Sequence, residues 1–291
     1  MVQVLPYVAR ESCFTLKGGT AINMFVRDVP RLSVDIDLVY VPIGSREDAL
    51  TGIHSALIRI GEDIKRGIPG VKVVMPGVKK QSPKLFVQKD KLLVKIEPNT
   101  IIRGLIYPSN KMRLGKTAED LFQMSAAISV ASMADLYGGK LCAALDRQHP
   151  RDIFDIMLLL ENEGITEDIL TAFVVYLASH DRAMHELLDP NIKDISKIFE
   201  TEFFGMTVKP VSLSALTDVQ KRLGKLIRSS LDDRRKNFLI SIKKGAPKWE
   251  LLGIKELAAF PALRWKLINI QKMDKRKHQE LLKKLEAVFD K

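Results

Sequence analysis

The sequence predicts an α/β (α+β) fold in which a mixed β-sheet covered by helices is followed by a helical, basic C-terminal lobe. Short apolar segments that alternate with polar residues, as β-strands do, occur in the first 130 of the 291 residues. Beyond them, apolar residues recur at steps of three and four, the spacing of amphipathic helices. Positions 209–291 also hold 21 Lys and Arg against 9 Asp and Glu, whereas the preceding 208 residues hold 25 against 26. We therefore expect an α/β lobe over 1–130, a helical part over 131–205 and a basic helical region over 206–291.

The first elements surround a glycine turn. Residues 4–11 are compatible with a short helix, and residues 14–16 with a strand that runs into Gly18-Gly19-Thr20. A helix is predicted over 21–27, where apolar residues have helical spacing, and Pro30 ends it. Residues 34–41 are predicted to be a strand because β-branched and aliphatic residues dominate there.

The rest of the α/β lobe follows from the same periodicities. Residues 47–65 place apolar side chains at steps of three and four, so we expect an amphipathic helix. Further strands are predicted over 71–75, 84–88 and 91–97, and the last two would form a hairpin that turns at Lys89-Asp90.

The remainder of the chain is predicted to be helical. Ser132 is a suitable N-cap for a helix to residue 145, and Pro150 opens a second helix to residue 160. Further helices are expected over 166–180, 191–204 and 216–231, with final basic helices after a break at 246–249. The helix over 216–231 has one apolar stripe, from which Lys221, Lys225 and Arg228 are expected to point away.

Two carboxylates and the glycine turn form the most informative pattern. Residues two apart on a strand point to the same side, so Asp35 and Asp37 should project together while Val34 and Ile36 face the core. Converging carboxylates favour a cation between them, and hard oxygen ligands suit Mg²⁺. Glycines leave backbone N–H groups open to a phosphate at the start of a helix. Each motif is common in ordinary turns, but together they indicate nucleotidyl transfer.

A third carboxylate would join this site under one condition. Glu97 ends the strand predicted over 91–97, and Leu93, Lys95 and Glu97 share one face of it. If that strand lies beside the strand of Asp35 and Asp37, Glu97 becomes another metal-facing acid, and three carboxylates can hold two metal ions. Otherwise it is an exposed acid at a strand end.

Charged residues on the two helices after residue 131 are further candidates. Lys140 lies among small apolar neighbours, where a solvated lysine is less expected, and a point cation suits a triphosphate. Asp152 would orient this lysine or the acceptor. Asp152 and Asp155 could instead be acids that favour the start of a helix.

Bulk properties exclude several classes of protein. No stretch approaches the roughly 18 uninterrupted apolar residues of a membrane span, and the first residues lack the pattern of a signal peptide. Cys13 and Cys142 have no metal-ligand spacing, so reduced thiols and a cytoplasmic location are expected. The basic region favours a polyanionic partner through counterion release, although a solvated helical face would look the same.

Over roughly residues 5–160 the chain resembles the AbiEii/AbiGii nucleotidyltransferase toxins of the DNA polymerase beta-like superfamily. The resemblance rests on four motifs: a G-G-T turn, R-x-S/T-x-D-I-D, K-x-E-x-N, and D-L-x-x-x-K followed by R-D-x-x-D. They match Gly18, Gly19 and Thr20; Arg31, Ser33, Asp35 and Asp37; Lys95, Glu97 and Asn99; and Asp135, Lys140, Arg151, Asp152 and Asp155. Pro98 stands where the family usually has an aliphatic residue.

The resemblance implies a Mg²⁺-dependent toxin of a toxin–antitoxin, or abortive infection, system, encoded beside a DNA-binding antitoxin. It implies nucleotide transfer from an NTP to an RNA acceptor, with the tRNA 3′ end foremost. Asp35, Asp37 and Glu97 would be the metal ligands, and the first motif with Arg31, Ser33 and Lys140 would hold the nucleotide. Two alternatives stay open: a transferase that modifies a protein hydroxyl, and a catalytically silent RNA-binding module.

Overall fold

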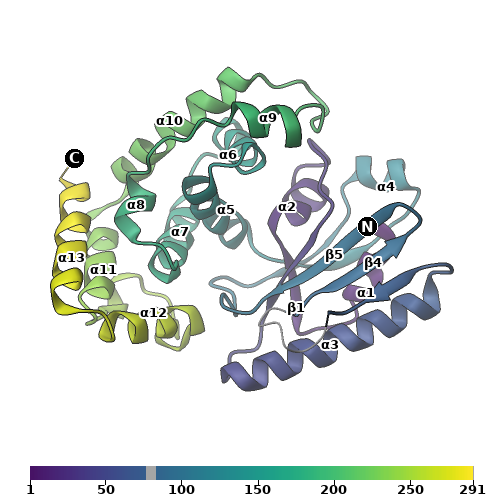
Figure 1. The fold of residues 1–291 in the computed structure, drawn as a ribbon, viewed down its shortest axis with the longest axis horizontal. Helices are drawn as coiled ribbons and strands as arrows, with labels where there is room; N and C mark the ends of the chain where they lie inside the picture. Colours follow the sequence, from purple (N-terminus) through teal and green to yellow (C-terminus); the bar gives the residue numbers. More distant parts are fainter. Residues whose placement is uncertain (77–82, 291) are drawn as a thin grey trace. The chain divides into compact units, whose positions relative to one another are not determined.

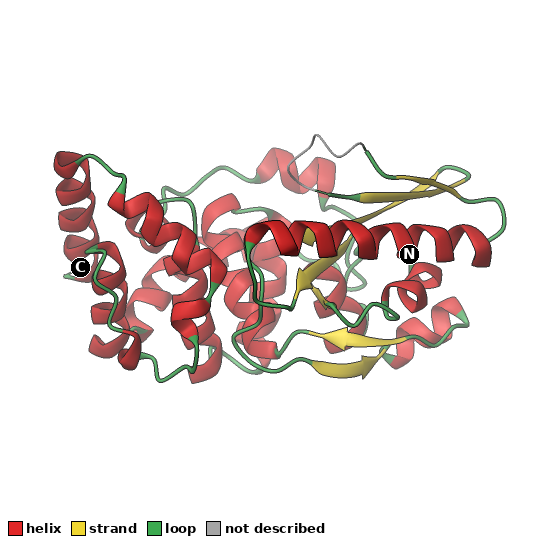
Figure 2. Ribbon diagram, turned by 90° about the horizontal axis from the view of Figure 1, so that it is seen from below, coloured by secondary structure: helices red, strands yellow, loops and turns green. Residues whose placement is uncertain are grey.

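The computed structural model describes residues 1–76 and 83–290, and the chain divides into two compact units, Met1–Ser132 and Met133–Lys291. The first unit is built on one seven-stranded mixed sheet with the strand order β3-β4-β5-β2-β1-β7-β6 (Figures 1 and 2). Its strands are β1 (Phe14–Lys17), β2 (Ile36–Tyr40), β3 (Lys72–Val74), β4 (Leu85–Lys89), β5 (Leu92–Asn99), β6 (Asn110–Arg113) and β7 (Ala127–Val130). The expected mixed α/β architecture is confirmed.

Helices flank this sheet. They are the 3₁₀ turn η1 (Val2–Val4), α1 (Leu5–Val8), α2 (Gly18–Ala21), the π-helix η2 (Ile22–Val26), α3 (Arg46–Gly67) and α4 (Lys116–Phe122). The long helix α3 packs beside β3 and β4, where Gly61 lies against the side chains of Val73 and Leu85. Ser45 caps α3 by accepting a hydrogen bond from the backbone N–H of Asp48.

The register of the central strands decides which residues meet. Strand β2 pairs with β1 in antiparallel fashion and with β5 in parallel fashion, and the second pairing sets Asp37 opposite Glu97. This satisfies the condition under which Glu97 joins the two aspartates. The predicted hairpin is also confirmed, because β4 and β5 pair antiparallel around Asp90, which has a φ of 53°.

Two expectations for this unit were wrong, and three of its elements were not predicted. The helix begins at Gly18 and not near residue 21, because Gly18 enters it directly from β1. Strand β2 begins at Ile36, so Val34 lies outside the ladder and is 52% exposed, not in the core. The segment from residue 100 to 130 also holds β6, α4 and β7, which are too short and too polar to show a clear period: Ala118 is the one buried residue of α4.

The second unit is helical. Its elements are α5 (Met133–Arg147), α6 (Pro150–Asn162), α7 (Glu167–Ser179), α8 (Met184–Leu188), α9 (Ser196–Glu202), α10 (Leu213–Ser230), α11 (Asp233–Lys243), η3 (Trp249–Leu251), η4 (Leu257–Ala259), α12 (Pro261–Gln271) and α13 (Lys275–Phe289) (Figure 1). Helix α7 is buried on every side from Ile169 onward, as expected for a helix that is apolar all round. It packs closely on α5 at Gly138, where a Cβ would lie 2.7 Å from the backbone nitrogen of Phe173.

The apolar stripe predicted for residues 216–231 is confirmed, because its five members are 0–4% exposed: Leu216, Val219, Leu223, Ile227 and Leu231. Arg228, however, does not point away. Its guanidinium donates to the carbonyl of Leu188 and to the carboxylate of Asp189, at 2.5 and 3.0 Å. Lys221 and Lys225 are exposed.

The helix expected over 191–204 is shorter, since α9 begins only at Ser196, whose backbone N–H bonds to Asp194. Helix α11 was not predicted as a separate element. Its Arg235 is 2% exposed and binds Glu167 and Asp232, so the buried side of α11 is partly charged and breaks the apolar pattern. Within the part of the chain that the structure describes, no helix is both long enough and apolar enough to span a bilayer.

Candidate active site

The glycine turn at the end of β1 is fixed by two close approaches. Gly18 has a φ of +71°, and a Cβ there would lie 2.5 Å from Oδ2 of Asp37. Gly19 would place a Cβ 3.0 Å from both Nη2 of Arg31 and Oγ of Ser33. Glycine is therefore needed at position 18 for both its backbone angle and its contact. The turn lies directly against the segment that leads into β2.

Hydrogen bonds tie the turn to that segment. The Thr20 hydroxyl is 3.0 Å from the Ser33 hydroxyl, and it donates to the carbonyl oxygen of Asp35. Thr20 is fully buried and Arg31 is 3% exposed, and Nη1 of Arg31 donates to the carbonyl of Leu32. These bonds take the place of strand pairing before Ile36, which explains why β2 starts later than its sequence pattern predicts. They also hold Asp35 beside the turn.

Two lysines join the three carboxylates. Nζ of Lys95 lies 2.7 Å from Oε2 of Glu97 and 3.9 Å from Oδ2 of Asp35, while Nζ of Lys84 lies 2.5 Å from Oε1 of Glu97. The hydrogen bond to Glu97 raises the pKa of the Lys95 ammonium against the effect of burial, and the charges of Asp35, Glu97 and Asp37 add to the rise. The carboxylates of Asp35, Asp37 and Glu97 therefore all stabilise the charged form of Lys95.

The lysines in turn stabilise the charged form of Glu97. Burial raises the pKa of its carboxyl, but hydrogen bonds and charges from Lys84 and Lys95 outweigh burial, and the net pKa lies below its usual value. The strand pattern predicts that Lys95 and Glu97 share a face but does not predict their ion pair. Lys84 was missed although the β4–β5 hairpin was predicted, because its contact with Glu97 depends on the register that sets Leu85 opposite Ile96.

The side chains of this cluster can be compared with those that bind Mg²⁺ in proteins. Carboxylate oxygens are the ligands that Mg²⁺ prefers, and the convergence of three acids on the Lys95 ammonium marks a place that attracts a cation. Among the residues that the structure describes, no three acidic, histidine or cysteine side chains are grouped closely enough to enclose a metal ion. The carboxylates are thus of the kind that suits magnesium, but in the described part of the chain Glu97 binds two lysine ammonium groups and the acids are not gathered around a metal position.

The second unit holds a buried ion-pair cluster. Nζ of Lys140 lies 2.8 Å from Oδ1 of Asp152 and 3.0 Å from Oδ2 of Asp155, and the side chains are 8%, 4% and 0% exposed. Arg147 binds the other oxygen of Asp152 at 2.7 Å. Asp155 is therefore not an exposed acid at a helix start.

The opposite charges in this cluster offset the free-energy cost of burying each charged group. Burial raises the pKa of the Asp152 carboxyl, but the positive charges of Lys140 and Arg147 outweigh it and leave the pKa below its usual value. On the same helix as Lys140, Asp135 accepts a 2.6 Å hydrogen bond from the buried Tyr176 hydroxyl. The candidate residues thus form two groups, one in each unit: the turn with Asp35, Asp37 and Glu97, and Lys140 with Asp152.

Comparison with known proteins identifies the family of this chain. Residues 1–268 match the family described as nucleotidyl transferase AbiEii toxin of type IV toxin–antitoxin systems. MenT4, a nucleotidyltransferase toxin from Mycobacterium tuberculosis, has a similar fold, with a TM-score of 0.61 at 14% identity over 98% of this chain and 90% of that one. JHP933 from Helicobacter pylori gives a TM-score of 0.42 at 16% identity, over 79% and 89% of the two chains. No curated protein matched.

Proposed function

Because this chain belongs to the AbiEii family of nucleotidyltransferase toxins of type IV toxin–antitoxin systems, we propose that it transfers nucleotides from an NTP to an RNA acceptor, the 3′ end of a tRNA. One observation carries the choice of site: strand pairing sets Asp37 opposite Glu97 while the Asp37 carboxylate contacts Gly18. A phosphate-binding turn and an acidic cluster are thereby joined in one place.

The triphosphate would lie over Gly18 and Gly19, where glycine leaves no β-carbon beside the backbone N–H groups. Arg31 supports this placement, because its guanidinium lies against Gly19 and adds positive charge behind the turn. Thr20 and Ser33 would hold the turn in shape through their mutual hydrogen bond. The nucleotide-binding residues act here mainly by preorganisation, which lowers the cost of ordering a ligand.

Asp35, Asp37 and Glu97 would hold Mg²⁺, which when bound would neutralise the triphosphate and make the acceptor hydroxyl more acidic. Lys95 and Lys84 neutralise Glu97 in the structure. Both ammonium groups must move away before Glu97 can receive a proton from the acceptor or ligate a cation. The two lysines would thus keep the acids charged and close together before substrates bind.

Lys140 would offset the charge that develops on the departing pyrophosphate, an electrostatic role that typically contributes about 10²–10³ in rate. Asp152 supports this role because it holds the Lys140 ammonium at 2.8 Å while Arg147 balances the second oxygen of the acid. Asp152 would therefore act as a positioning residue for Lys140.

The RNA acceptor would be bound by the basic region over 209–291, where Lys221 and Lys225 are exposed. Membership of a toxin–antitoxin system implies an antitoxin partner, which we propose to be a DNA-binding protein encoded nearby. We propose that the enzyme acts in the cytoplasm, where its NTP and tRNA substrates are found.

A labelling experiment separates the proposed acceptor from its alternatives. A cell lysate is incubated with NTPs labelled at the α-phosphate, with wild type or with Asp37→Asn, and then treated with RNase or with protease. We expect label that RNase removes and protease does not, and none with the variant. Label that resists RNase and is removed by protease would identify a protein acceptor. Absence of label with the wild type would favour a silent RNA-binding module.

A further inference from the structure

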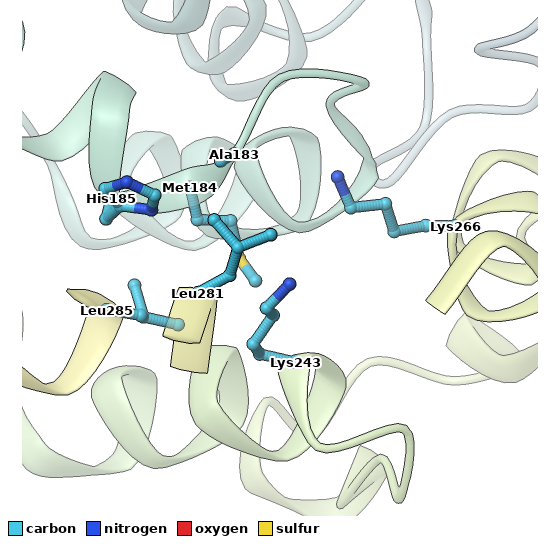
Figure 3. Close-up of a pocket in the computed structure, with 7 residues that line it drawn as sticks. All are labelled: Ala183, Met184, His185, Lys243, Lys266, Leu281 and Leu285. Carbon is cyan, nitrogen blue, oxygen red and sulfur yellow. The ribbon is translucent and has the colours of Figure 1, made fainter. Parts of the chain in front are cut away.

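A small cavity in the second unit is lined by three basic side chains that the proposed reaction does not use. Lys243 from the end of α11, Lys266 from α12 and His185 from α8 reach it from separate elements (Figure 3). The rest of its wall is apolar and comes from Ala183, Met184, Leu281 and Leu285. Positive groups that converge in a largely apolar wall are a reason to look for an anion.

Lys243 is the central observation. It is 6% exposed, and the polar contact of its ammonium is the sulfur of Met273 at 3.9 Å. Among residues 1–76 and 83–290, no carboxylate lies within 4 Å of this nitrogen. Burial lowers the pKa of Lys243, and the nearby charge of Lys277 lowers it further. A buried ammonium without a counter-charge is costly, and a bound anion would remove that cost.

Lys266 differs from Lys243 in having partners. Its Nζ donates to the carbonyl oxygens of His180, Asp181 and Arg182, at 2.5, 3.4 and 3.3 Å, where α7 has just ended. Burial lowers its pKa to about 8, and the charge of Lys243 contributes to the decrease. The two lysines therefore repel each other across the cavity, and an anion between them would relieve this repulsion.

His185 adds a hydrogen-bond donor to the cavity and not a further positive charge. Burial lowers the pKa of its imidazole; the charges of Lys284 and Lys243 also lower it, whereas those of Glu186 and Glu280 raise it. The imidazole can still donate a hydrogen bond when it is neutral, so the cavity offers a donor besides the two amines. Glu280 is occupied by its own ion pair with Lys284 at 2.7 Å.

We propose that Lys243, Lys266 and His185 form a binding site for a small oxyanion of the phosphate class. The cavity has room for about one water molecule. A compact, terminal phosphate group can therefore enter only when side chains of the wall move, and the continuous backbone of a duplex is excluded. The long, flexible side chain of Lys243 can swing to admit the ligand. The same chemistry is offered by free inorganic phosphate and by the 5′-monophosphate of an RNA. The inference does not rest on the proposed transfer reaction, because the site lies within the helical unit and needs no NTP.

Calorimetric titration of the full chain with inorganic phosphate, at constant ionic strength, tests this site. We expect the wild type to bind saturably, and Lys243→Met to bind at least about tenfold more weakly, because a charge-assisted hydrogen bond is lost. Lys244→Met is the matched control, since Lys244 is the exposed neighbour on the same helix end, and it should bind like the wild type. The absence of saturable binding to the wild type, or equal affinity in Lys243→Met, would overturn the proposal.

A second measurement guards against misfolding and identifies the source of the phosphate. In thermal unfolding without phosphate, Lys243→Met should be at least as stable as the wild type, because the variant lacks a lone buried charge. Added phosphate should raise the melting temperature of the wild type but not that of the variant. Binding of one short RNA with a 5′-phosphate or a 5′-hydroxyl is then compared. A phosphate preference that needs Lys243 assigns the site to RNA ends, whereas equal binding of the two RNAs assigns it to the free anion.

Discussion

Replacing Lys140 by methionine should strongly destabilise the helical unit. The substitution keeps the length of the side chain but removes the ammonium that lies 3.0 Å from Asp155, whose side chain is 0% exposed. Removing one partner of a buried ion pair typically costs about 3–5 kcal/mol. This loss of stability has an upper limit, because a buried carboxylate without its partner can take up a proton instead of staying charged. Protonating an ordinary aspartate of pKa about 3.9 costs about 1.36 kcal/mol per pH unit above that value, or about 4 kcal/mol at pH 7. We therefore expect a loss of about 3–4 kcal/mol at pH 7.

Urea unfolding at two pH values measures this loss. At pH 5 the same upper limit falls to about 1.5 kcal/mol, so the difference between wild type and Lys140→Met should shrink as the pH is lowered. Lys221→Met, on an exposed face, is the control and should change the free energy of unfolding by less than about 0.5 kcal/mol. If Lys140→Met unfolds within about 1 kcal/mol of the wild type at pH 7, the buried ion pair does not exist as described.

The double variant Lys140→Met/Asp155→Leu separates stability from catalysis. Because both charges are replaced by apolar groups, most of the lost stability should return, while Asp152 keeps its bond to Arg147. If Lys140 only stabilises the fold, nucleotide transfer should return with the stability. If Lys140 stabilises charge in the transition state, as we propose, the stable double variant should remain slower by about 10² or more.

Three further predictions concern single features of the two units. Gly138→Ala should lower the free energy of unfolding by about 1–3 kcal/mol in urea titration, because a Cβ there meets Ala172 and Phe173 in α7. Gly139→Ala is the control and should be neutral or stabilising, because its Cβ would have no contact closer than 4.0 Å. Lys221→Gln with Lys225→Gln should reduce the slope of log tRNA affinity against log salt by about 0.7–0.9 per lost contact, and an unchanged slope would mean a merely solvated face. Cys142 is 4% exposed and burial raises the pKa of its thiol, so it should react with iodoacetamide at pH 8 only when its unit unfolds.

Strand periodicity predicted the faces of Asp37 and Glu97, but Asp35 lies before the start of β2 and not on a shared strand face with Asp37. Periodicity also did not predict how the acids are neutralised. The positions of Asp37 and Glu97 on their strands predict the side of the sheet to which each points. The two acids meet only if β2 pairs with β5, and the structure shows this pairing. The ion pair of Lys84 with Glu97 was not predicted, because it depends on the exact register of the β4–β5 hairpin. Val34 was misplaced because local hydrogen bonds of Thr20 replace the ladder before Ile36.

In the second unit the apolar stripes were predicted well and the charged residues poorly. The stripe of α10 follows from sequence spacing alone, whereas the role of Arg228 does not. Arg228 binds Asp189, which lies 39 residues away, and such a partner is set by helix packing. The burial of Arg235 in α11 likewise depends on Glu167, at the start of another helix. Long charged side chains therefore need the tertiary structure before they can be called exposed or structural.

Extension of purified tRNA, resolved to single nucleotides, tests the central claim most directly. The protein is incubated with magnesium, tRNA and each NTP in turn, and Asp37→Asn serves as the paired variant because Asp37 contacts the turn and faces Glu97. We predict discrete added nucleotides at the 3′ end with the wild type and none with the variant, while both proteins show the same unfolding transition. Undiminished extension by Asp37→Asn, or tRNA left unextended by the wild type with every NTP, would contradict the assignment of this site.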